Sequence, residues 1–208
     1  MMRNISIVFG FLLLLISCSE AGSESEPREL PFLGIAEEGE HYIIPPFAFV
    51  DQEGAEITES NVDGKIHVVD FFFTSCPDIC PKMNQQMLRV YDEYENDDEI
   101  LILSHTLDPK RDTVEALKTF SEGLGVSSEK WKMLSSPDHD YVFEVCKTYM
   151  IAAGPDESIM GGIFHSGKFV LLDKERRVRG FYEGTDEDEV SKLIQDIKSL
   201  KAEGQKGA

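Results

Sequence analysis

The sequence predicts an α/β domain in which a central mixed sheet is flanked by helices. Two stretches, 65–73 and 100–107, are nearly continuous apolar runs rich in β-branched and aromatic residues, as expected of strands covered on both faces. Stretches with apolar residues at helical spacing follow each of them. With 208 residues, the chain is long enough for one sizeable domain with extensions at its ends.

The first half of the domain contains both long strands. Phe47 to Val50 predicts a short strand, and Asp51 to Gly54 predicts the turn that leads into the fold. A helix is expected after Pro81, a residue suited to a first helical turn, because apolar residues recur at positions 83, 87, 88, 91 and 94. Beyond the second strand, Asp112-Thr-Val-Glu115 resembles a capping box and predicts the start of another helix.

The second half predicts one more helix, a strand pair and a terminal helix. Asp138 opens a helix that reaches residue 150, and 164–173 and 178–182 suit a pair of strands. Thr185 is expected to cap the final helix. The order strand, helix, strand, helix, helix, strand, strand, helix indicates an α/β layout with a closing hairpin.

The N-terminus has the features of an export signal. Arg3 precedes the apolar stretch Ile5 to Ile16, which is too short for an ordinary membrane span. This stretch ends in Leu15-Ile16-Ser17-Cys18, which resembles the lipobox of bacterial lipoproteins, where the chain is cut before the cysteine and the cysteine is acylated. We therefore expect a signal peptide over 1–17, a lipidated Cys18 with a flexible tether over 18–40, a domain over 41–203 and a tail over 204–208.

The predicted location is a bacterial cell envelope, with the protein held to a membrane by lipid and facing the periplasm or exterior. The formal net charge of −19 repels phosphate backbones, so nucleic acid is not an expected partner. Of the four cysteines, Cys18 is assigned to the anchor. Cys146 lies in a helical apolar stripe and is expected to be a small buried hydrophobe.

The remaining two cysteines lie in Cys76-Pro77-Asp78-Ile79-Cys80-Pro81, between the first long strand and its helix. Active groups of open α/β sheets gather at the carboxyl ends of strands, and a dithiol at this place indicates a thioredoxin-like fold. The spacing allows the two Cα atoms to lie within the window of about 4.4–6.8 Å that a disulfide tolerates. Thiolates bind Cu(I), Zn or iron–sulfur clusters, and a close pair also cycles through a disulfide. A redox enzyme, a metal site and a structural staple all remain open.

The surroundings of this pair differ from those of thioredoxin-type enzymes. Those enzymes have two residues between the cysteines and a cis-proline before the following hairpin strand. Here three residues intervene, the nearest proline before Phe164 is Pro155, and the expected region holds His165. A neutral imidazole would add a third ligand that suits copper. We interpret the other histidines and the nearby methionines as structural or surface residues: His105 as structural, Met83 and Met87 as core, and His41, His67 and His139 as surface or loop residues.

Together these residues resemble the Sco/SenC copper proteins, which help assemble the copper centre of cytochrome c oxidase. The resemblance covers about residues 46–200. It rests on four segments: Cys76-Pro77-x-x-Cys80-Pro81-x-Met83, Asp108-Pro109-x-Arg111-Asp112-Thr113, Trp131-Lys-Met-Leu134 and His165-Ser166. The resemblance implies that Cys76, Cys80 and His165 bind copper, and that the partner is a copper-receiving oxidase subunit or another copper chaperone.

One position departs from the family pattern. The family commonly has Asp immediately before the ligand histidine, whereas this chain has Phe164. Outer-shell groups tune metal sites, so the substitution is expected to change the affinity or the redox poise of the site while leaving its ligands in place. Asp108 and Arg111, in the second family segment, are expected to organise the turn into the next helix.

The function implied is that of a metallochaperone carrying Cu(I), Cu(II) or both. It would be redox-gated, because oxidation of Cys76 and Cys80 to a disulfide abolishes binding. The alternative is a membrane-anchored thiol–disulfide oxidoreductase that reduces cysteines of a copper-receiving partner and does not need His165. A peroxidase would need an activating Arg beside the loop, which offers Thr74 only. An interaction domain stapled by a Cys76–Cys80 disulfide would take up no copper.

Overall fold

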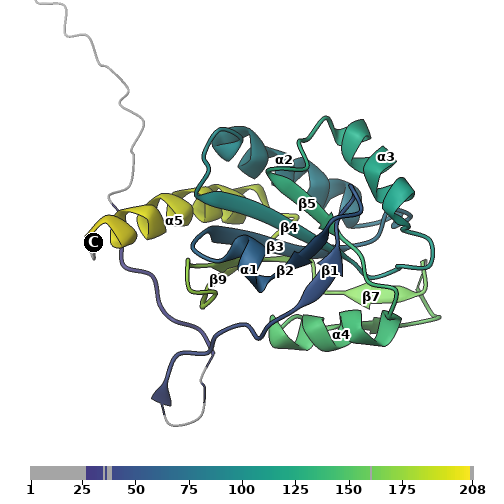
Figure 1. Cartoon of the computed structure of the whole chain (residues 1–208), viewed down its shortest axis with the longest axis horizontal. Helices are drawn as coiled ribbons and strands as arrows, with labels where there is room; N and C mark the ends of the chain where they lie inside the picture. Colours follow the sequence, from purple (N-terminus) through teal and green to yellow (C-terminus); the bar gives the residue numbers. More distant parts are fainter. Residues whose placement is uncertain (1–26, 35, 37–38, 160, 207–208) are drawn as a thin grey trace, which may run out of the picture.

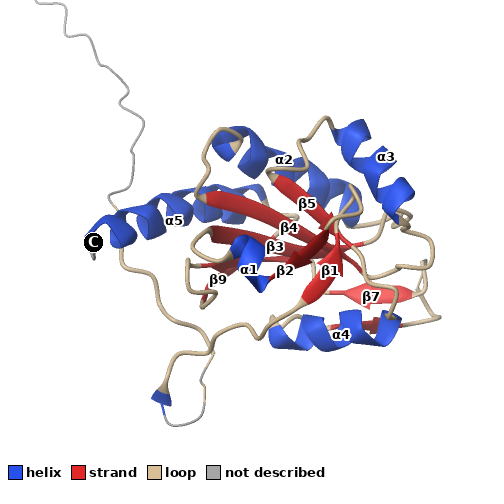
Figure 2. Cartoon of the chain, in the orientation of Figure 1, coloured by secondary structure: helices blue, strands red, loops and turns tan. Residues whose placement is uncertain are grey.

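The centre of the fold is a five-stranded mixed sheet (Figure 1 and Figure 2). Its strands are β3 (Ile66–Phe72), β4 (Ile100–Thr106), β5 (Trp131–Leu134), β8 (Lys168–Leu172) and β9 (Val178–Glu183). They lie in the order β5-β4-β3-β8-β9; β3, β4 and β5 are parallel, whereas β8 is antiparallel to both of its neighbours. The computed structural model describes residues 27–206 except 35, 37, 38 and 160, so the predicted signal segment and Cys18 lie outside the described residues.

Helices cover both faces of this sheet. One face packs against α2 (Cys80–Tyr94), α3 (Val114–Leu124) and α5 (Glu187–Lys206). The other face packs against α4 (His139–Thr148), the short α1 (Glu59–Val62) and the hairpin of β1 (Ala48–Val50) and β2 (Glu56–Thr58). A separate two-stranded sheet consists of β6 (Ala153–Pro155) and β7 (Ile163–His165). This is the predicted thioredoxin-like α/β fold.

Both long apolar runs form central strands. All seven residues of β3 and all seven of β4 are buried, as expected of strands covered on both faces. The helix predicted after Pro81 begins one residue before it, at Cys80, and Met83 and Met87 are buried in the core as predicted. Cys146 is fully buried in α4, which confirms its interpretation as a small apolar residue.

The structure differs from the predicted strands and helices at several places, including the following three. The predicted strand 164–173 is two strands, β7 and β8, because residues 166–167 carry the chain from the small sheet to the central one. The final helix is capped by Asp186 and not by Thr185, since the Asp186 carboxylate accepts two backbone N–H groups of the first turn at 2.9 and 3.0 Å. β5 is not predicted, because the polar Lys132 interrupts its short apolar pattern.

Residues 28–33, here called the N-terminal strap, pack against the domain. Leu30 is only 2% exposed, and the Arg28 guanidinium lies 2.6 Å from the Asp196 carboxylate on α5. The tether predicted over 18–40 therefore does not extend through the strap, because specific contacts hold these residues. At the other end of the chain, α5 includes the first three residues of the predicted tail. Within the described ranges, no helix is both long enough and apolar enough to cross a membrane.

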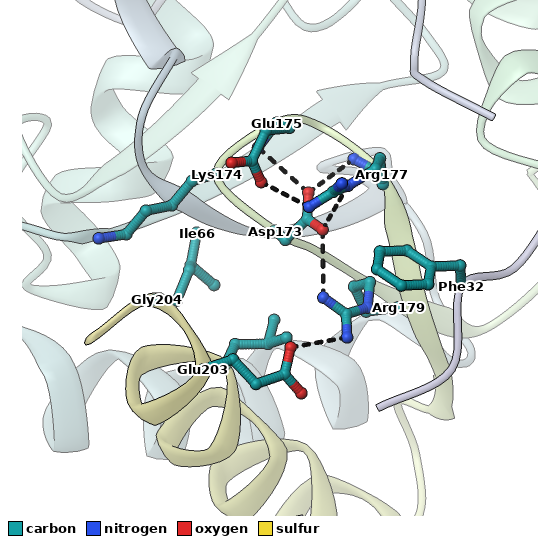
Figure 3. A pocket seen from close by; sticks show the side chains of 10 residues that line it. Phe32, Ile66, Asp173, Lys174, Glu175, Arg177, Arg179, Glu203 and Gly204 are labelled. Atoms are coloured by element: carbon teal, nitrogen blue, oxygen red, sulfur yellow. Dashed lines mark hydrogen bonds and ion pairs between the residues drawn. The ribbon is translucent and has the colours of Figure 1, made fainter. Parts of the chain in front are cut away.

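Arg179 on β9 connects the strap to the rest of the domain (Figure 3). Its side chain is 3% exposed, and its guanidinium pairs with Asp173 at 3.2 Å and with Glu203 at 2.8 Å. The same guanidinium donates to the backbone carbonyl of Leu30 at 2.7 Å and lies 4.1 Å from the centre of the Phe32 ring. One buried arginine therefore joins the strap, the central sheet and α5.

Two histidines are buried in the sheet. His67 lies on β3, is 2% exposed and has its Nε2 atom 2.7 Å from the Val62 carbonyl. Its predicted surface position is wrong, because β3 is buried along its whole length. His105 on β4 lies 4.5 Å from the Phe49 ring, centre to centre, and no described residue hydrogen-bonds to either of its ring nitrogens. The other two histidines predicted at the surface are exposed or partly exposed: His41 and His139.

Burial of His105 predicts acid sensitivity of the fold. Burial lowers the pKa of His105 from 6.5 to about 3. Between these values the unfolded chain binds a proton that the folded chain does not, so stability is present above pH 6.5 and is lost as the pH falls. His105→Phe is expected to make the plot of unfolding free energy against pH shallower by about 1.4 kcal/mol per pH unit near pH 5. Urea denaturation between pH 4.5 and 7 measures this slope, and equal slopes for the two proteins would contradict the assignment.

Candidate metal centre

Three elements position the predicted ligands at the carboxyl end of β3. The chain leaves β3 at Phe72, and the Cys76 N–H donates to the Phe73 carbonyl at 3.2 Å in the loop that follows. Cys80 is the first residue of α2 and is 2% exposed, whereas Cys76 is partly exposed. His165 ends β7, where it pairs with β6. The two cysteines and the histidine therefore come from a loop, a helix start and a strand end.

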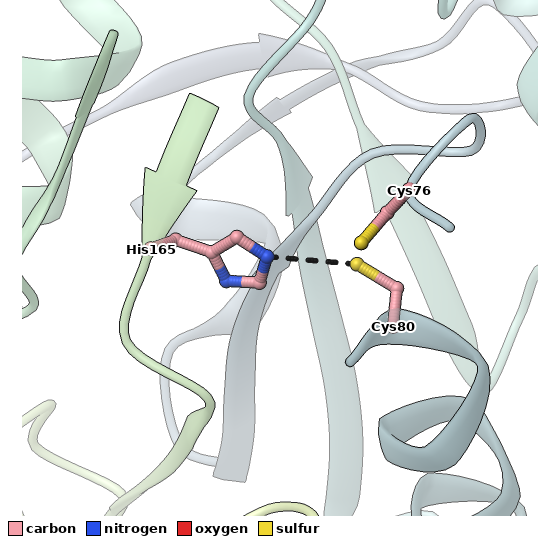
Figure 4. A group of neighbouring side chains, drawn as sticks. All are labelled: Cys76, Cys80 and His165. Atoms are coloured by element: carbon pink, nitrogen blue, oxygen red, sulfur yellow. Dashed lines mark hydrogen bonds between the residues drawn. The ribbon is translucent and has the colours of Figure 1, made fainter. Parts of the chain in front are cut away.

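The three side chains converge (Figure 4). Their ligand atoms, the two Sγ atoms and an imidazole nitrogen, all lie within 4.8 Å of one another, and Cys80 Sγ is 3.5 Å from His165 Nε2. Metal–sulfur bonds of about 2.3 Å place two sulfurs on one ion at most about 4.6 Å apart. Small side-chain movements would therefore bring all three groups onto a single ion. Cys76 and Cys80 are both free thiols in the structure.

The hydrogen bonds of His165 select the tautomer that suits a metal ligand. Its Nδ1 atom lies 3.3 Å from the Ser166 carbonyl, which only accepts, so Nδ1 carries the proton. The lone pair of Nε2 then faces the sulfur of Cys80. Burial lowers the pKa of His165, and the bond to Ser166 only partly offsets this effect. The imidazole is therefore neutral at pH 7 and available to bind.

The thiol of Cys80 is protonated in the metal-free protein. Burial raises the pKa of this thiol above its ordinary value, and the hydrogen bond with Cys76 raises it further. Because a metal binds the thiolate, capture of an ion displaces the proton.

Two apolar hollows border the sulfurs. One, of about 280 Å³, lies between α2 and α3 and is lined by Cys76, Cys80, Leu88 and Phe120 among others. The second, of about 250 Å³, is lined by Cys76, His165 and the exposed Phe164 among others. Hollows therefore lie on two sides of Cys76, although Cys80 is buried.

Phe164 is 42% exposed and packs over Gly154 of β6. It occupies the position before His165, where the sequence predicts a departure from the family pattern.

The Asp108 carboxylate pairs with Arg111 at 3.0 Å, which confirms that these two residues organise the turn before α3.

A further residue of this region, Asp112, contacts the loop that carries Cys76. Asp112 is fully buried, and its carboxylate hydrogen-bonds to Thr74, two residues before Cys76. The N-cap of α3 is Thr113, whose hydroxyl accepts the Ala116 N–H. Sequence reasoning missed this contact, because Asp112 and Thr74 are 38 positions apart and only the fold brings them together.

Comparisons with known proteins point to one family. Residues 35–202 match the family model described as SCO1/SenC. The SCO1 protein homolog of Bacillus subtilis is 25% identical over 160 residues, which are 76% of this chain and 83% of that protein. A SCO2-like protein of Rickettsia prowazekii is 30% identical over 156 residues, covering 72% of this chain and 74% of that protein.

Solved structures show the same fold. A SCO1/SenC family lipoprotein from Bacillus anthracis matches with a TM-score of 0.71 and 25% identity, over 77% of this chain and 95% of that one. Yeast Sco1 with copper bound matches with a TM-score of 0.60 and 26% identity, over 76% of this chain and 89% of that one. The family match spans the central sheet, the dithiol loop and His165, and the chain therefore belongs to the SCO1/SenC family.

Proposed function

We propose that this protein is a copper chaperone whose metal is held by Cys76, Cys80 and His165. The observation that carries the proposal is the convergence of two sulfurs and one imidazole nitrogen within 4.8 Å. Thiolate sulfur favours Cu(I), and imidazole suits copper in either oxidation state. The copper bound by the yeast relative supports this choice of metal over zinc.

The dithiol also gates the site. When Cys76 and Cys80 join in a disulfide, the two thiols lose two electrons and two protons. Of the three ligands, only His165 can then still bind the metal. Copper is then retained only by the reduced protein. Membership of the family supports delivery to an oxidase copper centre, directly to a copper-receiving oxidase subunit or through another copper chaperone.

The location follows from the N-terminal sequence. We place the lipid at Cys18, which lies outside the described residues, and the membrane in a bacterial cell envelope, with the domain on the periplasmic or exterior side. The relative from Bacillus anthracis, described as a lipoprotein, supports this location. The lipidated segment with its tether, the domain and the tail remain the proposed organisation, with the strap of residues 28–33 now counted in the domain.

A second candidate function uses the same two thiols. Cys76 is partly exposed and lies beside the buried Cys80, an arrangement in which an outer thiol can attack a partner's disulfide and an inner thiol can resolve the mixed disulfide. Such an oxidoreductase would reduce the cysteines of a copper-receiving partner. This function does not require the imidazole of His165.

Replacing His165 by alanine separates the two functions. The variant keeps both thiols but loses the nitrogen ligand, so its affinity for Cu(II) is expected to fall at least about a hundredfold, while disulfide exchange with dithiothreitol proceeds at the wild-type rate. Competition with a chelator of known affinity measures the first quantity, and stopped-flow reduction of the oxidised protein measures the second. Unchanged copper affinity with normal exchange would favour the oxidoreductase and contradict the chaperone.

A further inference from the structure

The buried carboxylate of Asp112 holds the loop that carries Cys76. Asp112 is 0% exposed. Its carboxylate accepts the backbone N–H of Thr74 at 3.0 Å, the hydroxyl of Thr74 at 2.5 Å and the hydroxyl of Thr106 at 2.5 Å. Thr106 ends β4 and Thr74 lies beyond the end of β3, so one side chain ties the ends of two neighbouring strands together.

This carboxylate is not needed to start α3. The N-cap of that helix is Thr113, which accepts the Ala116 N–H at 3.3 Å. Within the described ranges, every hydrogen bond to the Asp112 carboxylate comes from Thr74 or Thr106. The backbone of Asp112 is itself fixed, because its N–H donates to the Asp108 carbonyl at 2.9 Å and its carbonyl accepts the Ser135 hydroxyl at 3.3 Å.

Cys76 is the ligand that depends most on this support. Cys80 is fixed by the first turn of α2, and His165 by the pairing of β7 with β6. Cys76 lies on the loop between β3 and α2, two residues after Thr74. One of the hydrogen bonds to the Asp112 carboxylate comes from the Thr74 N–H and therefore holds the loop backbone itself.

We propose that Asp112 is a positioning residue for the metal centre: through Thr74 it sets the place of the Cys76 sulfur relative to Cys80 and His165. The proposal rests on the proposed copper function for its metal readout. Its chemical basis is preorganisation, because a ligand held in place before the ion arrives loses less conformational freedom on binding.

The test compares variants in the purified full-length protein. Thr74→Val is nearly isosteric and removes only the bond from the Thr74 hydroxyl, whereas Asp112→Ala removes the carboxylate that accepts all three hydrogen bonds. Copper affinity of the reduced protein, measured by chelator competition, is expected to fall about tenfold in Asp112→Ala and less in Thr74→Val. Asp112→Asn retains one oxygen for the Thr74 N–H and is expected to restore most of the affinity. If Asp112→Ala does not fold, Thr74→Val and Asp112→Asn decide the question.

Thr113→Ala is the matched control. It removes the N-cap of α3 one residue away and so weakens the same turn without touching Thr74. Its copper affinity is expected to change by at most about twofold. This change is much smaller than the loss expected for Asp112→Ala. Equal losses in the control and in Asp112→Ala would overturn the proposal, because the effect would then be one of general stability.

A second readout needs no copper. In a glutathione buffer, Cys76 and Cys80 together lose two electrons and two protons, and one glutathione disulfide takes them up to give two glutathione molecules. If Asp112 holds the sulfurs close, Thr74→Val and Asp112→Ala lower the equilibrium constant for disulfide formation by about threefold or more, and the control does not. Wild-type constants in both variants would overturn the proposal. Absence of copper in the wild-type protein would contradict the proposed copper function only. A shift in the equilibrium constant would still support the positioning role of Asp112 in that case.

Discussion

Replacing Cys80 by serine is expected to abolish copper retention. A serine hydroxyl stays protonated at neutral pH and is a poor ligand for Cu(I), so the site would keep one thiolate and one imidazole. The loss in affinity should be at least about a hundredfold, because replacing a residue that only supports a metal ligand already costs up to about a hundredfold. Cys76→Ser should behave in the same way, because its sulfur lies in the same group of three ligand atoms. Copper per chain after desalting measures retention.

Cys146→Ala is the matched control for these variants. It also removes one thiol, but Cys146 is fully buried in α4 and is not part of the convergent group. Its copper content is expected to equal that of the wild type. Wild-type copper content in Cys80→Ser, or equal losses in all three cysteine variants, would contradict the assignment of the ligands.

Replacing Arg179 by methionine is expected to destabilise the fold by about 3 kcal/mol or more. Methionine keeps much of the apolar stem but removes the charge that faces the side chains of Asp173 and Glu203. It also leaves the buried carbonyl of Leu30 without its donor. The cost is large because one partner of a buried charge network is removed while the others stay in place. Urea denaturation monitored by the fluorescence of Trp131 measures the loss.

The control for this variant is an exposed ion pair. Lys147 and Glu144 form a pair whose side chains are 68% and 67% exposed, so Lys147→Ala is expected to cost at most about 0.5 kcal/mol. A similarly small effect of Arg179→Met would show that the N-terminal strap contributes little to stability. The tether prediction would then hold for the strap in solution.

The sequence predicts most of the fold, because buried strands and amphipathic helices each leave a pattern within a single segment. The two central strands are continuous apolar runs, and α2 and α5 show apolar residues at helical spacing. The strap is not predictable in this way. Its sequence lies beside a stretch rich in polar residues, and its burial depends on a cation–π contact with Arg179, which is 147 positions after Phe32.

The site is predictable in unequal parts. Cys76 and Cys80 are close in sequence, so their spacing alone brings them together. His165 comes from 85 positions away, and the resemblance to the Sco/SenC family supplies it. The surface position predicted for His67 is wrong, because His67 lies within the run 65–73, which forms a strand buried on both faces. The sequence places Asp112 at a helix start and in a family segment but does not show its bond to Thr74, which exists only in the folded chain.

Copper titration of the wild-type protein tests the central claim most directly. The protein would be prepared in two forms, reduced with a phosphine and oxidised to the Cys76–Cys80 disulfide, and loaded with Cu(I) without oxygen. The convergence of Cys76, Cys80 and His165 predicts one copper per chain after desalting in the reduced form and none in the oxidised form. No copper in the reduced form, or equal copper in both forms, would contradict it.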